Sequence, residues 1–164
     1  ANRDYSFEIE EKEGSILLTV FGGKITTHRK LAEKAVSKIT SLLKFNRKEW
    51  TSTQHLPGGG FKLEDKEKII GGLLKKYKFL NIRWAERLFK TFGSEVEKVL
   101  EGAKEKPDLG RNFGHDLTER EVLWYINQEH VRCVEDLIWR RSKLGLRLTG
   151  KQIGELKSFI NNLK

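Results

Sequence analysis

The sequence has little of what builds a secreted or membrane-spanning protein. Cys133 is the only cysteine among 164 residues, so no disulfide can form within the chain and a reducing compartment is expected. No apolar run approaches the roughly 20 residues that a spanning helix needs, and no secretion signal opens the chain. These absences favour a cytoplasmic location. Methionine is absent even at position 1, which leads us to expect a fragment or a processed chain.

The sequence also lacks the residue patterns of a metal site or a cysteine nucleophile. It contains no HExxH or CxxC motif, and no histidine has a close His or Cys partner at metal-ligand spacing. We therefore expect no metal. Cys133 shares a helical face with Leu137, has no histidine beside it, and is expected to be buried and inert. The four histidines are His28, His55, His115 and His130.

Positive charge is present in excess and is concentrated near the start. The net charge is +9, and residues 23–48 contain eight Lys or Arg against Glu33 alone. Residues 1–22 contain five acidic and two basic residues. This balance suggests an anionic partner, which could be a nucleic acid, a phosphate or an acidic membrane surface.

The first 45 residues are patterned as a hairpin followed by a helix. Residues 5–10 alternate apolar and polar side chains, as in a half-buried strand, whereas residues 16–21 are almost continuously apolar, as in a strand covered on both faces. A helical period then predicts a helix over residues 26–43, with Thr26 or Thr27 as its N-cap. A lone hairpin is only marginally stable in water, so these strands are expected to need a larger sheet.

The rest of the chain is patterned as helices. Residues 46–63 contain Pro57 and three successive glycines, which indicate a connection. Three capping boxes predict helix starts, at Ser94 with Glu97, Thr118 with Glu121 and Thr149 with Gln152. Trp84, Trp124 and Trp139 fall in apolar helical periods and are expected in the core rather than as stacking platforms for bases. The predicted helices cover residues 65–78, 81–92, 94–101, 118–129, 131–143 and 149–163.

The turn FGGK at residues 21–24 is the most informative local motif. Two glycines let the backbone turn tightly, the following helix start presents unpaired N–H groups and partial positive charge, and Lys24 adds a full charge. Such a turn can hold an anion or the edge of a cofactor. The alternative is a plain strand-to-helix turn with a solvated lysine. A Walker A loop is excluded, because Leu18 and Ile25 stand where that motif needs Gly and Ser or Thr.

Longer stretches of the sequence resemble the FAD-dependent glycerol-3-phosphate dehydrogenases and the related α-glycerophosphate oxidases. The resemblance covers nearly the whole chain in the right order, with His28 and His130 standing where Tyr and Trp are expected. It is carried by FGGK with ITTHRKLAEKA (21–35), LPGGGF (56–61), YKFL (77–80), DLGRNFGHDLTEREVLWYI (108–126) and EHVRCVEDLIWRRSKLGLRL (129–148).

The resemblance implies a mainly α C-terminal part of a longer protein. Residues 1–45 would be the C-terminal remnant of the FAD-binding domain, a short β-hairpin and a helix, and residues 46–164 a C-terminal domain of about five to six helices. Gly23, Lys24, Ile25 and Thr26 would line the FAD, and Lys24 would lie near both the flavin and the substrate phosphate.

The activity implied by the resemblance is oxidation of sn-glycerol 3-phosphate to dihydroxyacetone phosphate, with quinone or oxygen as the final electron acceptor. The isolated fragment is expected to be inactive and to lack FAD. Its expected partners are its own N-terminal FAD domain and glycerol 3-phosphate. A homodimer and peripheral contact with the cytoplasmic membrane are further hypotheses, and no nucleic acid is expected. The alternative function is a stand-alone basic helical module that binds nucleic acid or an acidic partner surface.

Overall fold

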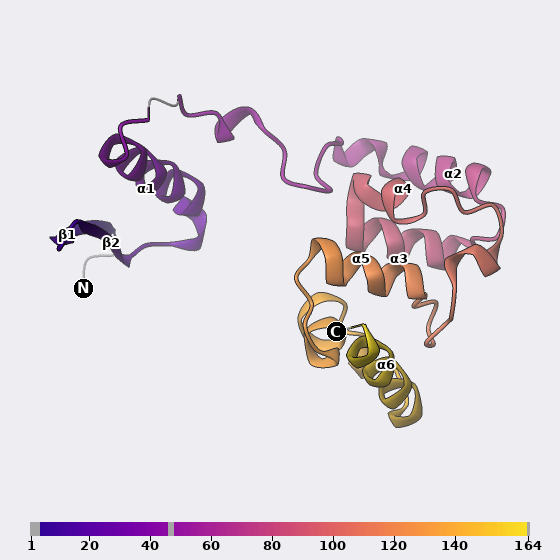
Figure 1. The fold of residues 1–164 in the computed structure, drawn as a ribbon. Helices are drawn as coiled ribbons and strands as arrows, with labels where there is room; N and C mark the ends of the chain where they lie inside the picture. Colours follow the sequence, from indigo (N-terminus) through magenta and orange to yellow (C-terminus); the bar gives the residue numbers. More distant parts are fainter. Residues whose placement is uncertain (1–3, 46–47, 164) are drawn as a thin grey trace. The chain divides into compact units, whose positions relative to one another are not determined.

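The chain folds into two compact units, residues 1–55 and residues 56–164 (Figure 1). The structure is a computed structural model that describes residues 4–45 and 48–163. The first unit holds a β-hairpin and one long helix, and the second is helical. The predicted mainly α class, with a short hairpin and helix ahead of several helices, is confirmed.

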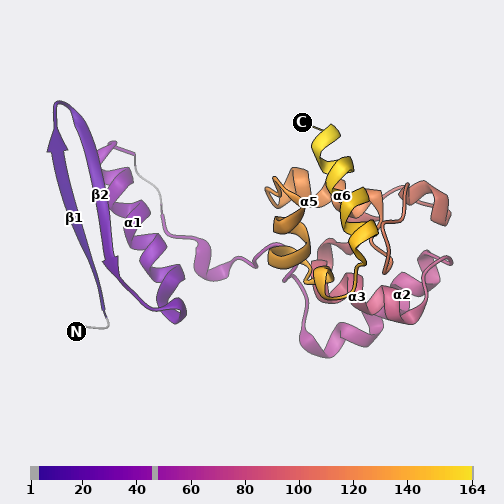
Figure 2. The same ribbon diagram turned by 90° about the horizontal axis from the view of Figure 1, so that it is seen from below.

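The first unit begins with the predicted hairpin. Strands β1 (Tyr5–Lys12) and β2 (Ser15–Gly22) pair antiparallel, with Tyr5 opposite Gly22 and Lys12 opposite Ser15. Helix α1 (His28–Leu42) follows a 3₁₀ turn at Ile25–Thr27 and lies alongside the hairpin (Figure 2). Local alternation and helical period were sufficient to predict these elements to within about two residues, as expected where patterning is strong.

The two faces of the hairpin have different surroundings. On the face toward α1, the ammonium groups of Lys34 and Lys38 lie 5.5 and 5.6 Å from the ring centroids of Tyr5 and Phe7. On the opposite face, Leu17 is 57% exposed and Phe21 is 50% exposed. None of the described residues of this unit is buried. The hairpin and α1 therefore form a layer with apolar surface on the outside and no closed core of their own.

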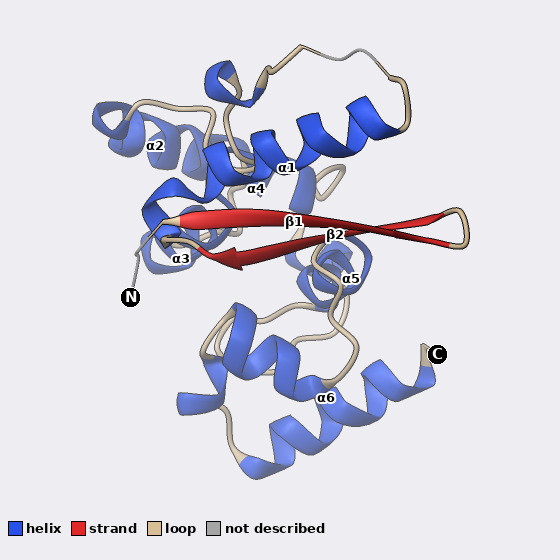
Figure 3. Ribbon diagram, turned by 90° about the vertical axis from the view of Figure 1, so that its left-hand side faces the viewer, coloured by secondary structure: helices blue, strands red, loops and turns tan. Residues whose placement is uncertain are grey.

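In its described residues, 56–163, the second unit contains five α-helices and one π-helical turn. Figure 3 draws its helices in blue. Its core includes the fully buried side chains of Trp84, Leu88, Phe113 and Tyr125. This core explains why the helical periods of the sequence predicted these elements well. The α-helices are α2 (Lys66–Lys76), α3 (Ile82–Phe92), α4 (Val96–Val99), α5 (Glu119–Gln128) and α6 (Gly150–Asn162), with the π-helix at Asp136–Arg141.

The glycine-rich connection packs directly on the end of α3. The N–H of Ser94 donates to the carbonyl of Gly58 over 3.0 Å. A Cβ atom at Gly93 would come within 1.9 Å of that same carbonyl oxygen, and Gly93 has a φ of 55°. Two backbones therefore approach more closely here than any side chain would allow.

One of the three predicted capping boxes forms. Thr149 accepts from the N–H of Gln152, whose side chain accepts from the N–H of Thr149 at the start of α6. At Thr118 the predicted helix start is confirmed, since Thr118 is the N-cap residue of α5, but the predicted box does not form. The Glu121 carboxylate binds Arg87 of α3 instead, and the Thr118 hydroxyl has no partner among the described residues.

The capping box predicted at Ser94 was also wrong. Ser94 lies inside a 3₁₀ turn at Gly93–Glu95, and the Glu97 carboxylate pairs with Lys76 instead. At α3, by contrast, a cap that the sequence did not reveal is present: the Asn81 side chain accepts from the N–H of Trp84 over 2.8 Å.

Residues 131–143 depart from the predicted helix. The Asp136 carboxylate accepts from the N–H groups of Arg132 and Cys133, over 3.0 and 3.1 Å, and so holds the backbone in a turn there. These bonds lower the pKa of Asp136 to about 2, and the bond from Arg132 has the largest effect. The helix that follows has π geometry, and Cys133 is half-buried rather than buried.

The prediction of a core tryptophan at position 139 was wrong. Trp139 is 42% exposed, and its ring lies against Gly145, where a Cβ atom would come within 2.6 Å of it. Trp84 is buried as predicted, and Trp124 is partly buried with its ring 6.5 Å from that of Phe92. The widened π turn changes the angular position of each residue, so the period of 3.6 misplaces Trp139.

Candidate functional site

The turn between β2 and α1 depends on two glycines. Gly22 and Gly23 have φ angles of 75° and 110°, which L side chains rarely adopt. A Cβ atom at Gly22 would lie 2.8 Å from the carbonyl oxygen of Asp4, and one at Gly23 would lie 2.9 Å from a methyl group of Leu31. The glycines therefore let the chain leave the hairpin and enter the helix without a clash.

The carbonyls of this turn are held by two side chains as well as by the backbone. The carbonyl of Lys24 accepts from the N–H of Thr27 over 3.0 Å and from its hydroxyl over 3.1 Å. The carbonyl of Ile25 accepts from the N–H of His28, and its oxygen lies 2.7 Å from His28 Nδ1. Thr27 is the N-cap residue of α1, one of the two residues predicted for that position. Its hydroxyl donates to the carbonyl of Lys24 and makes no capping bond to the N–H groups of the helix.

The first two backbone N–H groups of the turn point away from these carbonyls, because the C=O and N–H of one peptide plane are opposed. Ile25 and Thr26 occupy the first two positions of the 3₁₀ turn, where an N–H has no preceding carbonyl within the helix to bind. Both residues are exposed, and the Ile25 side chain is 88% exposed. In the described part of the chain no ion pair involves Lys24, which is also exposed. The turn thus offers donors, one full positive charge and an apolar side chain on one open surface.

All four residues predicted to line the cofactor lie on this surface. Gly23, Lys24, Ile25 and Thr26 are consecutive and exposed, so their proximity follows from the chain itself. Donors of this kind suit an anion or the electron-rich edge of a flat ring. The assignment of these four residues to FAD binding stays a prediction.

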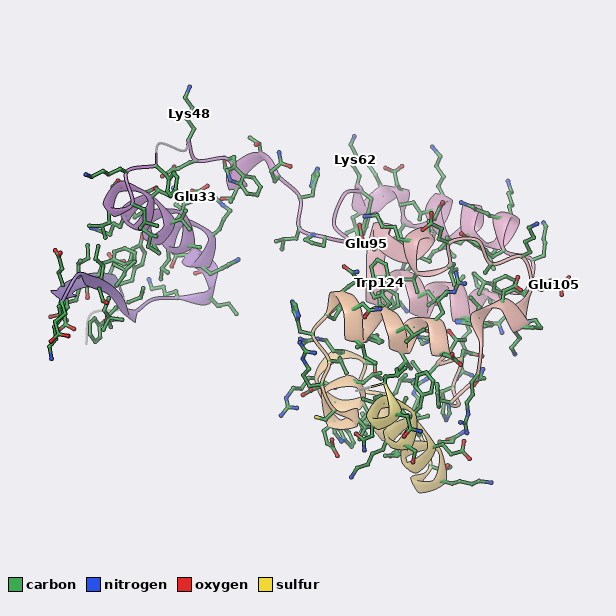
Figure 4. The ribbon with its side chains drawn as sticks, in the orientation of Figure 1. Glu33, Lys48, Lys62, Glu95, Glu105 and Trp124 are labelled. Atoms are coloured by element: carbon green, nitrogen blue, oxygen red, sulfur yellow. The ribbon has the colours of Figure 1, made fainter. Side chains whose placement is uncertain are left out.

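Behind the turn, a polar cluster ties the connection to α1. Arg29 donates to Glu33 over 2.8 Å and to the Thr51 hydroxyl over 3.2 Å, and that hydroxyl donates to Glu33, which Figure 4 labels on α1. The bond from Thr51, with the charge of Arg29, lowers the pKa of Glu33. The sequence signalled only the four-residue spacing of Arg29 and Glu33. It gave no sign that Thr51, more than twenty residues away from Arg29, would join them.

A cavity of about 230 Å³ lies beside this cluster, within the first unit. Its walls are mainly apolar and include Val36, Thr40 and Trp50, which is 60% exposed. Glu33, Lys48 and Glu49 also line it, and the Glu33 carboxylate is already bound by Arg29 and Thr51. The cavity is therefore a weaker candidate for a chemical site than the turn.

Among the described residues of the second unit, one ion pair has a fully buried carboxylate. Arg87 of α3 donates both terminal nitrogens to the Glu121 carboxylate of α5, over 2.8 and 2.7 Å, and also binds the carbonyl of Asp116 over 2.8 Å. Burial raises the pKa of Glu121, against the opposing effect of Arg87. The carboxylate is 1% exposed, so it cannot meet a substrate, and the pair joins two helices to a loop.

Two further classes of site are not seen in the described part of the chain. No three His, Cys, Asp or Glu side chains of residues 4–45 and 48–163 come together as metal ligands. None of the helices in these ranges is both long and apolar enough to cross a membrane.

The fold and the turn define a helical domain that follows a glycine-turned strand–helix unit. Residues 49–157 match the family model of the C-terminal domain of alpha-glycerophosphate oxidase, about two thirds of the chain. The chain belongs to that family. The resemblance stated from the sequence is thereby confirmed.

Curated relatives match almost the whole chain. It is 37% identical over 159 residues to the aerobic glycerol-3-phosphate dehydrogenase of Escherichia coli and 36% identical over 161 residues to the glycerol-3-phosphate dehydrogenase of Pseudomonas aeruginosa. It is also 33% identical over 160 residues to the D-erythritol 1-phosphate dehydrogenase of Brucella abortus. These matches cover 96–98% of this chain but only 31–32% of the relatives, so the chain spans about a third of their length.

Proposed function

We propose that this chain is the C-terminal part of an FAD-dependent glycerol-3-phosphate dehydrogenase, which oxidises sn-glycerol 3-phosphate to dihydroxyacetone phosphate. The observation that carries the proposal is the open FGGKIT turn, with outward N–H groups and a lysine that forms no ion pair with the described residues, in a chain that aligns with glycerol-3-phosphate dehydrogenases over 96–98% of its length. Quinone or oxygen would then take the electrons. The chain alone would be inactive.

The residues of the turn fit an FAD ring in their chemistry. Gly23 allows the turn into the helix start, the N–H groups of Ile25 and Thr26 offer donors, and Lys24 offers a positive charge. These are the groups that would stabilise negative charge on the cofactor during reduction. FAD would supply the two-electron acceptance that no side chain can provide. Lys24 would in addition attract the substrate phosphate.

We propose that residues 1–45 complete an FAD-binding domain and that residues 46–164 form the helical domain. The support is the exposed apolar surface of β2, which a neighbouring strand and further side chains would cover. A partner of this kind is the protein's own N-terminal FAD domain. Dimerisation and contact with an acidic membrane surface from the cytoplasmic side are proposals for the helical domain.

A second substrate is favoured by one relative. The similarity to a D-erythritol 1-phosphate dehydrogenase indicates that this kind of C-terminal part also occurs in an enzyme for a longer polyol phosphate. Both substrates share a phosphate and hydroxyl-bearing carbons. The whole enzyme should be assayed with both, and turnover of erythritol 1-phosphate in preference to glycerol 3-phosphate would replace the proposed substrate.

Lys24→Ala in the whole enzyme tests the site. We expect kcat/KM for glycerol 3-phosphate to fall about a hundredfold, because one positively charged donor is lost where charge develops. Lys30→Ala, which removes an equally exposed charge from α1, is the matched control. Wild-type kinetics for Lys24→Ala would remove Lys24 from the mechanism. Stoichiometric flavin absorbance in the isolated chain would contradict the proposed inactivity.

A further inference from the structure

We propose that Thr27 and His28 are positioning residues, which fix the direction of the N–H groups in the FGGKIT turn. This inference rests on the proposed function, because it assigns the turn a cofactor to face. We call their two side-chain contacts, Thr27 Oγ1 to the carbonyl of Lys24 and His28 Nδ1 to the carbonyl of Ile25, the turn clamp.

The geometry shows why a clamp is needed. The 3₁₀ turn has only three residues, and such turns have poorer hydrogen-bond geometry than an α-helix. A peptide carbonyl and the N–H of the next residue belong to one rigid plane. Fixing the carbonyl of Lys24 therefore fixes the N–H of Ile25, and fixing the carbonyl of Ile25 fixes the N–H of Thr26. These are the two donors of the open surface.

The chemistry of the contact assigns the proton on the histidine. A carbonyl oxygen can only accept, so Nδ1 carries a hydrogen and donates it over 2.7 Å. His28 is exposed, which leaves the far nitrogen, Nε2, toward solvent. The histidine thus acts on the turn through its near nitrogen.

Two pairs of near-isosteric substitutions in the whole enzyme test the clamp. His28→Asn keeps a donor at the position of Nδ1. His28→Leu introduces a side chain branched like that of asparagine but without a donor. Thr27→Ser keeps the hydroxyl, and Thr27→Val replaces it with a methyl group. Ser41→Ala is the control, because it removes a 2.8 Å bond from a hydroxyl to the carbonyl of Ser37 farther along the same helix.

We expect His28→Leu and Thr27→Val each to lower kcat/KM about tenfold, since small displacements of positioning groups have large effects on rate. The absorption maximum of the bound flavin should shift in both. His28→Asn, Thr27→Ser and Ser41→Ala should stay within about twofold of wild type in kcat/KM, because each keeps a side-chain donor on both clamped carbonyls.

Several outcomes would overturn the clamp. One is a lower melting temperature for His28→Leu with unchanged kinetics and spectrum, which would assign the contact to helix stability alone. Another is His28→Asn as impaired as His28→Leu. If His28→Leu does not fold, the Thr27 pair decides. If the clamp variants behave like wild type while Lys24→Ala is impaired, the clamp is refuted and the proposed function stands. Wild-type kinetics in Lys24→Ala would refute the site itself.

Discussion

At the scale of single residues, the Arg87–Glu121 pair is the most consequential polar contact of the second unit. It connects α3, α5 and the carbonyl of Asp116 through three hydrogen bonds of 2.7–2.8 Å. Its carboxylate is 1% exposed, so removal of the guanidinium would leave a buried charge without compensation.

Breaking the pair should be costly, and replacing it should not. We expect Arg87→Met to lower the free energy of unfolding by about 3–5 kcal/mol, because it leaves the buried Glu121 carboxylate without its partner. Glu121→Leu should lower it by less, because the Arg87 side chain is 21% exposed and can reach water. The double variant should recover most of the loss. Urea denaturation of the four proteins measures the coupling, and additive losses in the double variant would contradict it.

Two glycines of the second unit should respond in opposite ways to alanine. At Gly93 a Cβ atom would lie 1.9 Å from a backbone oxygen, whereas at Gly154 it would meet nothing within 4 Å. We expect Gly93→Ala to lower the unfolding free energy by at least about 2 kcal/mol. Gly154→Ala, inside α6, should raise it by roughly 0.5–1 kcal/mol. Equal changes in the unfolding free energy of the two variants, measured by denaturant titration, would show that the contact between Gly93 and Gly58 does not contribute to stability.

At the scale of the element, the caps show which sequence signals survive folding. Thr149 and Gln152 form the predicted box, since both are exposed or nearly so and no other partner competes for them. Glu121 has the same spacing from Thr118, but Arg87 of α3 takes its carboxylate. A capping box is a local pattern, and a tertiary ion pair overrides it.

The two threonines therefore give a matched test. Thr149→Ala should lower the unfolding free energy by about 1 kcal/mol, the usual value of a side-chain cap. Thr118→Val should be neutral or stabilising, because its buried hydroxyl has no partner among the described residues and costs free energy as it stands. A loss at Thr118 as large as that at Thr149 would reveal a partner such as a bound water.

The elements that sequence predicted well are those set by local periodicity. Strands β1 and β2 and helices α1, α3 and α6 were predicted to within a few residues at their ends. The stretch around Trp139 was not, because Asp136 binds two N–H groups ahead of it and the helix adopts π geometry. Those contacts depend on side-chain direction, which a period of apolar residues does not encode.

The same limit applies to the candidate site. The sequence singled out Gly23 and Lys24 by composition and by family resemblance, and the structure places both on an open turn. It did not reveal that Thr27 and His28 hold the carbonyls of that turn, or that Thr51 joins Arg29 and Glu33. Such contacts appear only when backbone geometry is known.

At the scale of the whole molecule, the two units should differ in stability when the chain stands alone. Among the described residues, every buried side chain lies in the second unit. We expect amide hydrogens of β1 and β2 to exchange at least about a thousandfold faster than those of α3 and α5, because the hairpin opens locally without exposing a core. Hydrogen exchange with mass spectrometry measures this. Slow exchange in β2 that persists on tenfold dilution would contradict it, whereas protection lost on dilution would indicate pairing with a second copy.

The exposed strand β2 also has a consequence for the handling of the protein, because it favours aggregation. The eight residues of β2 have unpaired backbone groups along one edge and exposed apolar side chains on both faces. Further chains can pair with this edge as additional strands. Aggregation in concentrated solution is therefore expected to begin at β2. A polar substitution at Leu17 should delay turbidity without altering the helical half.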